Sequence, residues 1–369
     1  MKMSNTKMGS IDFVMFSTIL LLVSIGVVMV YSASSYSAFF NPTINDSMYY
    51  LKRQAINAVI GLILMFFTIK IDYHELKKYT GIFMIITIIL LLVVFAFPAI
   101  NGAKRWINLG FTSLQPSEIA KYMVVLFMAK SIEQKGEKIK SLTVGIFPYL
   151  IVSGMFAALV FKEKNLSIAV VIMTVTLIVL FVGGARLRHL FMLLGLVGGL
   201  GVAGIAFESY RLTRFLSFLN PWADPRGAGY QLIQSLLALG SGGIWGVGLG
   251  KSRQKCFYIP EPHNDFIFAI IGEELGLIGC MFIIALFITL IWRGIVASVN
   301  SKDTYGTLLA AGITSVIAIQ AIINIAVVTG SIPVTGVPLP FISYGGSSIV
   351  INLAAMGVLL NISRQSNRG

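Results

Sequence analysis

The segment LSIAVVIMTVTLIVLFVGG, residues 166–184, contains no Asp, Glu, Lys or Arg. A helix needs about 20 consecutive, mostly apolar residues to cross the hydrocarbon core of a bilayer. The segment is therefore typical of a membrane-spanning helix, and it decides the fold because similar runs recur along almost the whole chain. We predict ten spans, at residues 13–31, 55–71, 81–100, 117–130, 143–161, 166–184, 188–206, 264–292, 305–328 and 341–362.

The composition of the 369 residues agrees with this fold and excludes a soluble globular protein. Hydrophobic residues make up 56% of the chain and charged residues only 12%, whereas a soluble domain carries roughly 25% charged residues. The two cysteines cannot form a disulfide framework, and no His/Cys cluster has the spacing of a zinc site. We predict an all-α polytopic membrane protein, with residues 1–369 forming a single integral membrane domain.

The net charge of +13 would suggest nucleic-acid binding in a soluble protein, but here its distribution indicates topology. If ten spans place both chain ends in the cytoplasm, fifteen Lys and Arg residues fall in inside segments and six in the short outside loops. Positive residues in short loops are retained on the cytoplasmic side. We therefore expect a multi-pass protein of the cytoplasmic membrane, with residues 1–12 and 363–369 inside and no nucleic-acid partner.

The longest connection between predicted spans, residues 207–263, joins the seventh and eighth spans and is expected outside the membrane. It is too apolar and aromatic for a disordered loop, and residues 228–240 are expected to form an amphipathic helix at the membrane face. Its glycine run, residues 240–250, lacks the Walker spacing because Trp245 stands where a glycine is required. Two interpretations remain: a re-entrant turn packed on helices, or an anion-binding nest of N–H groups.

Charged side chains inside membrane spans are rare and by default paired or functional. Glu118 and Lys121 lie at positions i and i+3 of the fourth predicted span, on one face of the helix. One interpretation is a structural ion pair that holds this short helix against its neighbours. The other makes Lys121 a cation that lines a polar cavity, with Glu118 setting its orientation.

Asp265 lies where the outer loop meets the eighth span, and Asp is a favoured N-cap residue. Capping alone would explain this residue. The alternative is a lone catalytic base, because Glu273 and Glu274 lie about 12 to 13 Å deeper along a helix that rises 1.5 Å per residue. That distance disfavours a two-carboxylate hydrolase pair within this segment.

Two further features point to the outer face. The basic residues near the outer face form either a solvated rim in contact with lipid headgroups or a clamp for an anionic group, since guanidinium groups bind phosphate oxygens in pairs. They are Arg105, Arg211, Arg214, Arg226, Lys251, Arg253 and Lys255. The proline- and glycine-rich residues 331–348 predict irregular backbone before the last span. Such backbone at membrane depth is tolerated where it lines a cavity or is covered by protein, so we expect a cavity that opens outward.

Five segments resemble motifs of the SEDS family (shape, elongation, division and sporulation). They are NGAKRWINLG (101–110), LQPSEIAKY (114–122), FLNPWADPRGAGYQLIQSLLALGSGGIWGVGLGKS (218–252), IPEPHNDFIFAIIGEELG (259–276) and PVTGVPLPFISYGGSS (333–348). The resemblance runs in order from about residue 13 to residue 362. NPWADP, the Gln254–Lys255 pair and VYSAS near the first span are more similar to the FtsW and SpoVE branch than to RodA.

The resemblance implies a bacterial peptidoglycan glycosyltransferase that polymerises lipid II on the extracytoplasmic side of the membrane, in cell division, cell shape or sporulation. It implies that Asp265 is the catalytic carboxylate and that Glu118 and Lys121 are the family's polar pair. Asn165 departs from the family, which often has Asp there, and this puts a charge role at that position in question. The remaining candidates for substrate binding are Arg105, Arg211, Arg214, His263 and Ser343.

The implied reaction sets the expected cofactors and partners. The leaving pyrophosphate needs positive charge from Arg, Lys or a divalent cation, Mg²⁺ or Mn²⁺, and no organic cofactor is expected. The expected partners are lipid II, a class B penicillin-binding protein and other division or elongation proteins. Two alternatives stay open: a lipid II flippase, whose transport would survive loss of Asp265, and a non-catalytic scaffold for the penicillin-binding protein.

Overall fold

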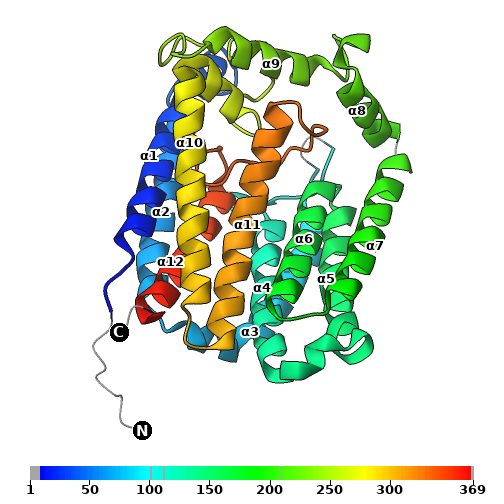
Figure 1. The fold of residues 1–369 in the computed structure, drawn as a ribbon. Coiled ribbons are helices and arrows are strands. Elements are labelled where there is room, and N and C mark those ends of the chain that lie inside the picture. Colours follow the sequence, from blue (N-terminus) through cyan, green and yellow to red (C-terminus); the bar gives the residue numbers. More distant parts are fainter. Residues whose placement is uncertain (1–8, 100–101, 111–112, 208, 367–369) are drawn as a thin grey trace.

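The computed structural model describes residues 9–99, 102–110, 113–207 and 209–366. Within these residues ten long helices form one bundle (Figure 1). They are α1 (Phe13–Phe39), α2 (Tyr49–Lys70), α3 (Tyr73–Val93), α4 (Pro116–Lys135), α5 (Phe147–Lys162), α6 (Leu166–Val182), α7 (Leu187–Ala206), α10 (Ile267–Val299), α11 (Thr304–Val328) and α12 (Gly346–Ser366). The all-α polytopic prediction is confirmed, with one helix for each predicted span.

Shorter elements connect these helices. Two of them, α8 (Ser209–Leu219) and α9 (Tyr230–Gly242), lie across one end of the bundle (Figure 1), so the helix predicted near residues 228–240 is present as α9. A two-stranded antiparallel ladder pairs β1 (Ile107–Asn108) with β2 (Ser113–Leu114). The remaining elements are η1 (Val94–Ala96), η2 (Gly136–Lys140), η3 (Leu142–Ile146) and η4 (Pro221–Ala223).

Several helices extend beyond the predicted spans. α1 continues to Phe39, α2 begins at Tyr49, and α10 continues to Val299. Hydropathy locates the part of a helix that lies in hydrocarbon, whereas polar turns at its ends continue the same backbone hydrogen bonds without an apolar signal. The last helix begins at Gly346, five residues later than predicted, because the proline- and glycine-rich segment before it is irregular.

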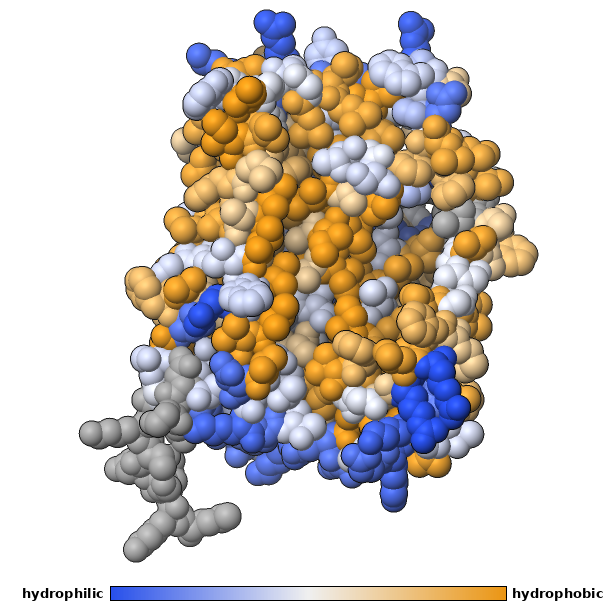
Figure 2. All heavy atoms as spheres, in the orientation of Figure 1, coloured by the Kyte–Doolittle hydropathy of each residue, from blue (hydrophilic) through white to orange (hydrophobic). Residues whose placement is uncertain are grey.

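The outer surface matches a bilayer. Eight helices are long and apolar enough to cross one, and α6 is a shorter apolar helix. Figure 2 shows an apolar side surface, with hydrophilic residues gathered at the end of the bundle where α1 begins and α12 ends. These two helix ends therefore share one side, and α8 and α9 lie on the other (Figure 1).

The centre of the bundle is formed by α4 and α11, which pack against each other and against α6. Over half of the α4 residues are buried, among them polar residues such as Ser117 and Glu118. Because its neighbours shield it from lipid, α4 does not need the apolar composition of a lipid-facing span. This explains why the span predicted here from hydropathy, residues 117–130, was the shortest of the ten.

The predicted glycine run is a re-entrant turn that packs on a break in α10. Gly276 has φ 67° and ψ −167° inside that helix, and the backbone nitrogens of Val247 and Gly248 donate to the carbonyls of Glu273 and Glu274 at 2.9 and 3.0 Å. A Cβ on Gly276 would lie 2.4 Å from the nitrogen of Gly246. The glycines therefore allow two backbone segments to lie in direct contact.

Candidate functional site

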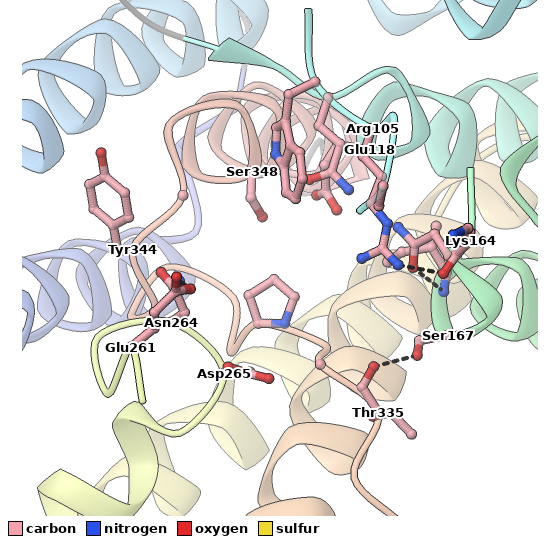
Figure 3. A pocket seen from close by; sticks show the side chains of 18 of the residues that line it. Arg105, Glu118, Lys164, Ser167, Glu261, Asn264, Asp265, Thr335, Tyr344 and Ser348 are labelled. Carbon is pink, nitrogen blue, oxygen red and sulfur yellow. Dashed lines mark hydrogen bonds between the residues drawn. The ribbon is translucent and has the colours of Figure 1, made fainter. Parts of the chain in front are cut away.

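A cavity of about 790 Å³ lies beneath α8 and α9, which contribute Arg214 and Gln231 to its lining. Its other walls come from the first turns of α2, α4, α6 and α12 and from the irregular segment 333–338 (Figure 3). A cavity, as expected from the proline- and glycine-rich segment, is therefore present at the end of the bundle where α8 and α9 lie (Figure 1).

Helix N-termini converge on this cavity. Lining residues include Gln115 before α4, Asn165 before α6, and Gly346 at the start of α12. The first turns of a helix carry unpaired backbone N–H groups and a partial positive charge. Several such ends around one space favour an anionic ligand.

The charged side chains add to this potential. Among the lining residues, Glu118 is already paired with Lys121, which leaves Glu261 and Asp265 as the acids without such a partner. The cationic lining residues are Arg53, Arg105, Lys164 and Arg214. The cavity therefore combines a positive excess with two carboxylates on its lower and left walls in Figure 3.

Asp265 faces the cavity and does not cap α10. The N-cap position is Phe266, without a side-chain hydrogen bond, and no other described residue donates a hydrogen bond to the Asp265 carboxylate. Burial raises the pKa of Asp265 above its ordinary value, its own backbone N–H lowers it, nearby Glu261 raises it and Arg214 lowers it. The capping interpretation is thus not supported, and the carboxylate is available for chemistry.

The backbone around Asp265 is fixed by α11. Buried Asn324 donates from Nδ2 to the carbonyls of Asp265 and Val337, each at 2.8 Å. Gly336, with φ +74°, brings its chain so close that a Cβ there would lie 3.4 Å from Asp265 Oδ2. Asn324 therefore ties the catalytic candidate to the opposite loop of the cavity.

Arg105 is held by the turn between α5 and α6. Its Nε donates to the carbonyl of Glu163 at 3.1 Å, and a second nitrogen donates to the carbonyl of Lys164. Asn165 caps α6 by accepting from the nitrogen of Ile168 at 3.3 Å. An amide oxygen is sufficient for this cap, so Asn165 has a role here that requires no charge.

Lys121 is not among the described residues that line the cavity. Its Nζ lies 2.9 Å from Glu118 Oε2 and 2.9 Å from Gln320 Oε1, and its side chain is 0% exposed. The structure therefore favours the ion-pair interpretation. In this structure Lys121 contacts Glu118 and Gln320, and it holds the cavity-lining Glu118 in place.

Two other sequence candidates, His263 and Ser343, also are not among the described residues that line the cavity. His263 packs its ring 4.2 Å from that of Tyr50 and 5.5 Å from that of Tyr344, and burial lowers its pKa to about 4. Ser343 accepts from the nitrogen of Leu339 at 2.8 Å and stabilises a turn. Both are buried behind the wall: Ser343 through its hydrogen bond and His263 through its contacts with the two tyrosine rings. The side chain of Arg211 lies outside the described residues.

Sequence reasoning missed several lining residues. Arg53 and Lys164 were counted only among the six basic residues of the predicted short outside loops. Both line the cavity, as Arg105 does. Glu261 and Asn264 lie within the motif that contains Asp265, and the Asn264 amide donates to the Glu261 carboxylate at 2.7 Å. Their positions in the motif were the available signal.

Comparisons with known proteins agree with this architecture. The cell cycle protein family of FtsW, RodA and SpoVE matches residues 12–368. Stage V sporulation protein E of Bacillus subtilis (strain 168) is 46% identical over 366 residues, which cover 98% of this chain and 99% of that protein. The "Probable peptidoglycan glycosyltransferase FtsW" of Geobacter sp. (strain M18) is 42% identical over 357 residues, covering 95% and 96%.

Solved structures share the fold. A chain from a study of "Structural coordination of polymerization and crosslinking by a peptidoglycan synthase complex" superposes with a TM-score of 0.79 at 25% identity, covering 98% of this chain and 99% of that one. The rod shape determining protein RodA of Thermus thermophilus gives a TM-score of 0.70 at 25% identity, covering 96% and 97%. The chain therefore belongs to the FtsW, RodA and SpoVE family of polytopic membrane proteins.

Proposed function

We propose that this peptidoglycan glycosyltransferase joins lipid II units in the cavity, with Asp265 as the general base. The proposal rests on one observation about the cavity. The Asp265 carboxylate, which accepts no hydrogen bond from another described residue, lies in the same cavity as four cationic side chains and several helix N-termini. A base and an anion-binding surface are the two groups that glycosyl transfer from a diphosphate donor requires.

The reaction balances with these groups. A sugar hydroxyl of one lipid II attacks the anomeric carbon of the MurNAc of another, and a C–O bond forms as the bond from that carbon to the diphosphate oxygen breaks. The Asp265 carboxylate takes the hydroxyl proton, which typically contributes about 10² to 10⁴ in rate. Attack from the face opposite an α-linked diphosphate gives a β-linked glycan.

Positive charge around the cavity stabilises the leaving diphosphate. Arg105 and Arg214 can each present a guanidinium fork to phosphate oxygens, and Arg53 and Lys164 add charge at the rim. Because the backbone already holds the Arg105 guanidinium at two carbonyls, little ordering is needed when the diphosphate binds. The prenyl chains would lie between helices in the hydrocarbon region.

Mg²⁺ or Mn²⁺ remains an expectation from the resemblance. Among the described residues no three His, Cys, Asp or Glu side chains gather as a metal site, so the protein donors do not fit an ion bound by the chain alone. Such an ion would depend on the oxygens of the diphosphate itself. The steps above are therefore assigned to the residues of the chain.

Two observations support the expected orientation of the chain in the membrane and its expected partner. The excess of Lys and Arg in the segments near the chain termini favours a cytoplasmic position for that end, which would leave the cavity on the extracytoplasmic side of the bacterial membrane. One structural neighbour comes from a synthase complex that couples polymerization with crosslinking. We propose a class B penicillin-binding protein as the crosslinking partner, with other division or elongation proteins.

The test is glycan polymerisation from purified lipid II by the wild-type chain and by Asp265→Asn, each with and without the partner transpeptidase. We expect the variant to lose at least about 10²-fold in rate. Asp46→Asn is the matched control, because Asp46 is a partly exposed aspartate paired with Lys52 outside the cavity. Its rate is expected to equal that of the wild type.

The outcome also separates the alternatives. Normal polymerisation by Asp265→Asn would rule out Asp265 as the base. Lipid II translocation in proteoliposomes by a wild-type chain that forms no glycan would support a flippase. Wall synthesis that survives Asp265→Asn in cells would support a scaffold.

A further inference from the structure

Glu163 is a buried carboxyl group that the reaction above does not use. It follows α5 directly and is 0% exposed. Neither carboxyl oxygen has a hydrogen-bond partner of normal length and angle among the described residues, although the Ser117 hydroxyl lies near enough to affect its pKa. Burying a carboxylate without such partners is unfavourable, so the neutral acid is the form that this position favours.

The electrostatics of the site agree with a neutral acid. Burial raises the pKa of Glu163 to about 8, while the nearby charge of Arg105 and the Ser117 hydroxyl act in the opposite direction. The group is therefore protonated at pH 7 and ionised at pH 9. This change of charge occurs within the pH range where a membrane protein remains folded and can be assayed.

Glu163 and Arg105 meet at the same turn. The carbonyl of Glu163 accepts from Arg105 Nε at 3.1 Å, and the carbonyl of Lys164 accepts from a second guanidinium nitrogen. Arg105 lines the cavity, whereas the Glu163 side chain lies behind the wall. The Arg105 guanidinium is thus bonded to the turn that carries the buried acid, is close enough to affect the pKa of that acid, and belongs to a residue that lines the space where a diphosphate would bind.

The charged groups described on the neighbouring helices do not act on Glu163 in place of Arg105. On α4, Glu118 and Lys121 neutralise each other at 2.9 Å. The α6 sequence, residues 166–182, contains no titratable residue, and the titratable residues of α3 lie in its first two turns, residues 73–79, at the other end of that helix. Lys164, beside Glu163 on the turn, lines the cavity.

We propose that Glu163 is a positioning residue for Arg105: the neutral acid leaves the guanidinium charge to the diphosphate of the substrate, and the ionised acid competes with the diphosphate for it. The inference rests on the proposed function, because it takes the bound anion to be the diphosphate of lipid II. It gives the site a built-in decrease in affinity at alkaline pH.

The experiment measures lipid II binding by the purified full-length chain at pH 7 and pH 9, which requires no turnover. For the wild type we expect the Kd to rise roughly tenfold between the two values, the loss that follows when one charge-assisted contact is weakened. Glu163→Gln is expected to show less than about a twofold rise, because the amide has the same shape and no charge to gain. Glu137→Gln, a change at an exposed glutamate on η2, is the matched control and should behave as the wild type.

Thermal unfolding shows whether the fold accommodates the introduced amide. A carboxyl whose folded pKa is raised contributes stability that is complete below its unfolded pKa and is lost as the pH rises through about 8. Glu163→Gln is therefore expected to unfold at a higher temperature than the wild type at pH 8 and at a similar temperature at pH 4.

Equal pH dependence of binding in the wild type and in Glu163→Gln would overturn the inference, as would the absence of lipid II binding at pH 7. A pH effect that Glu163→Gln removes would support it. Failure of the proposed function has a different signature: Asp265→Asn would polymerise normally while the binding difference between the wild type and Glu163→Gln persists.

Discussion

Asp265 and the pair Glu273 and Glu274 are carboxylates of the same stretch of chain, yet their surroundings are opposite. Glu273 accepts from the nitrogen of Arg253 at 2.9 Å and from the Ser252 hydroxyl. Glu274 accepts from Ser32 Oγ at 2.6 Å and from Lys255 Nζ at 2.8 Å. Asp265 accepts no hydrogen bond from another described residue and faces the cavity.

The difference agrees with a structural role for the two glutamates and with the proposed role of Asp265 as a base. The two glutamates connect α10, α1 and the loop at residues 250–255, so their charge is used in holding these segments together. A buried carboxylate with complete partners is a poor proton acceptor, whereas one with an open face can accept a proton from a substrate. Burial and sequence position alone would not distinguish them.

The largest effect on stability is expected from breaking the glutamate network. Lys255→Met leaves Glu274 buried without its cation, and removing one partner of a buried ion pair costs about 3–5 kcal/mol. Thermal unfolding of the purified protein in detergent checks this. Adding Glu274→Leu should restore much of the loss, since the remaining pair is apolar, and an unaltered unfolding temperature in Lys255→Met would show that the network carries no stability.

A second destabilising substitution, at the contact between the glycine turn and α10, is Gly276→Ala. Its φ of 67° and ψ of −167° suit glycine alone, and the added Cβ would meet the backbone of Gly246 at 2.4 Å. We expect a loss of about 1–3 kcal/mol from the strained backbone. Gly154→Ala on α5, where a Cβ meets nothing within 4 Å, is the control, and equal unfolding temperatures for the two variants would contradict the docking described for the glycine turn.

A sharper test of the proposed site is Asn324→Leu, which removes the hydrogen bond to the Asp265 carbonyl and the one to the Val337 carbonyl. We expect kcat for glycan synthesis to fall roughly tenfold, which corresponds to about 1.4 kcal/mol in the barrier. Steady-state kinetics would show the loss in kcat more than in KM, because the base is displaced while the cationic lining is retained. A loss confined to KM would instead assign Asn324 to substrate binding.

The smallest effect concerns pH. Burial raises the pKa of Asp265, and nearby Glu261 raises it further. The proposed base works only when ionised, so kcat/KM is expected to fall as the pH drops through that raised value. Glu261→Gln removes the neighbouring negative charge and should move the acid limb to lower pH. A shift to higher pH would show that Glu261 does not act on Asp265 in this way.

The prediction from sequence was strongest where hydropathy and motifs were continuous. It gave the all-α fold, the ten helices and Asp265, Arg105 and Arg214 as residues that line one site. His263, Ser343 and Lys121 are buried behind the wall of the cavity, and the sequence did not indicate this, because a polar residue in a motif looks the same whether it faces a cavity or packs behind its wall. It missed Arg53 and Lys164, whose charge also agreed with topology.

The amino-acid sequence determined the membrane fold by itself, since the transfer of apolar runs into hydrocarbon is a local property that depends little on neighbouring helices. Only the tertiary structure decided which carboxylate has partners and which does not. Ser32 reaches Glu274 across 242 residues, and Asn324 reaches the Asp265 carbonyl across 59. Hydrogen bonds act over a few ångströms, so the role of each buried charge depends on segments that only the folded chain brings together.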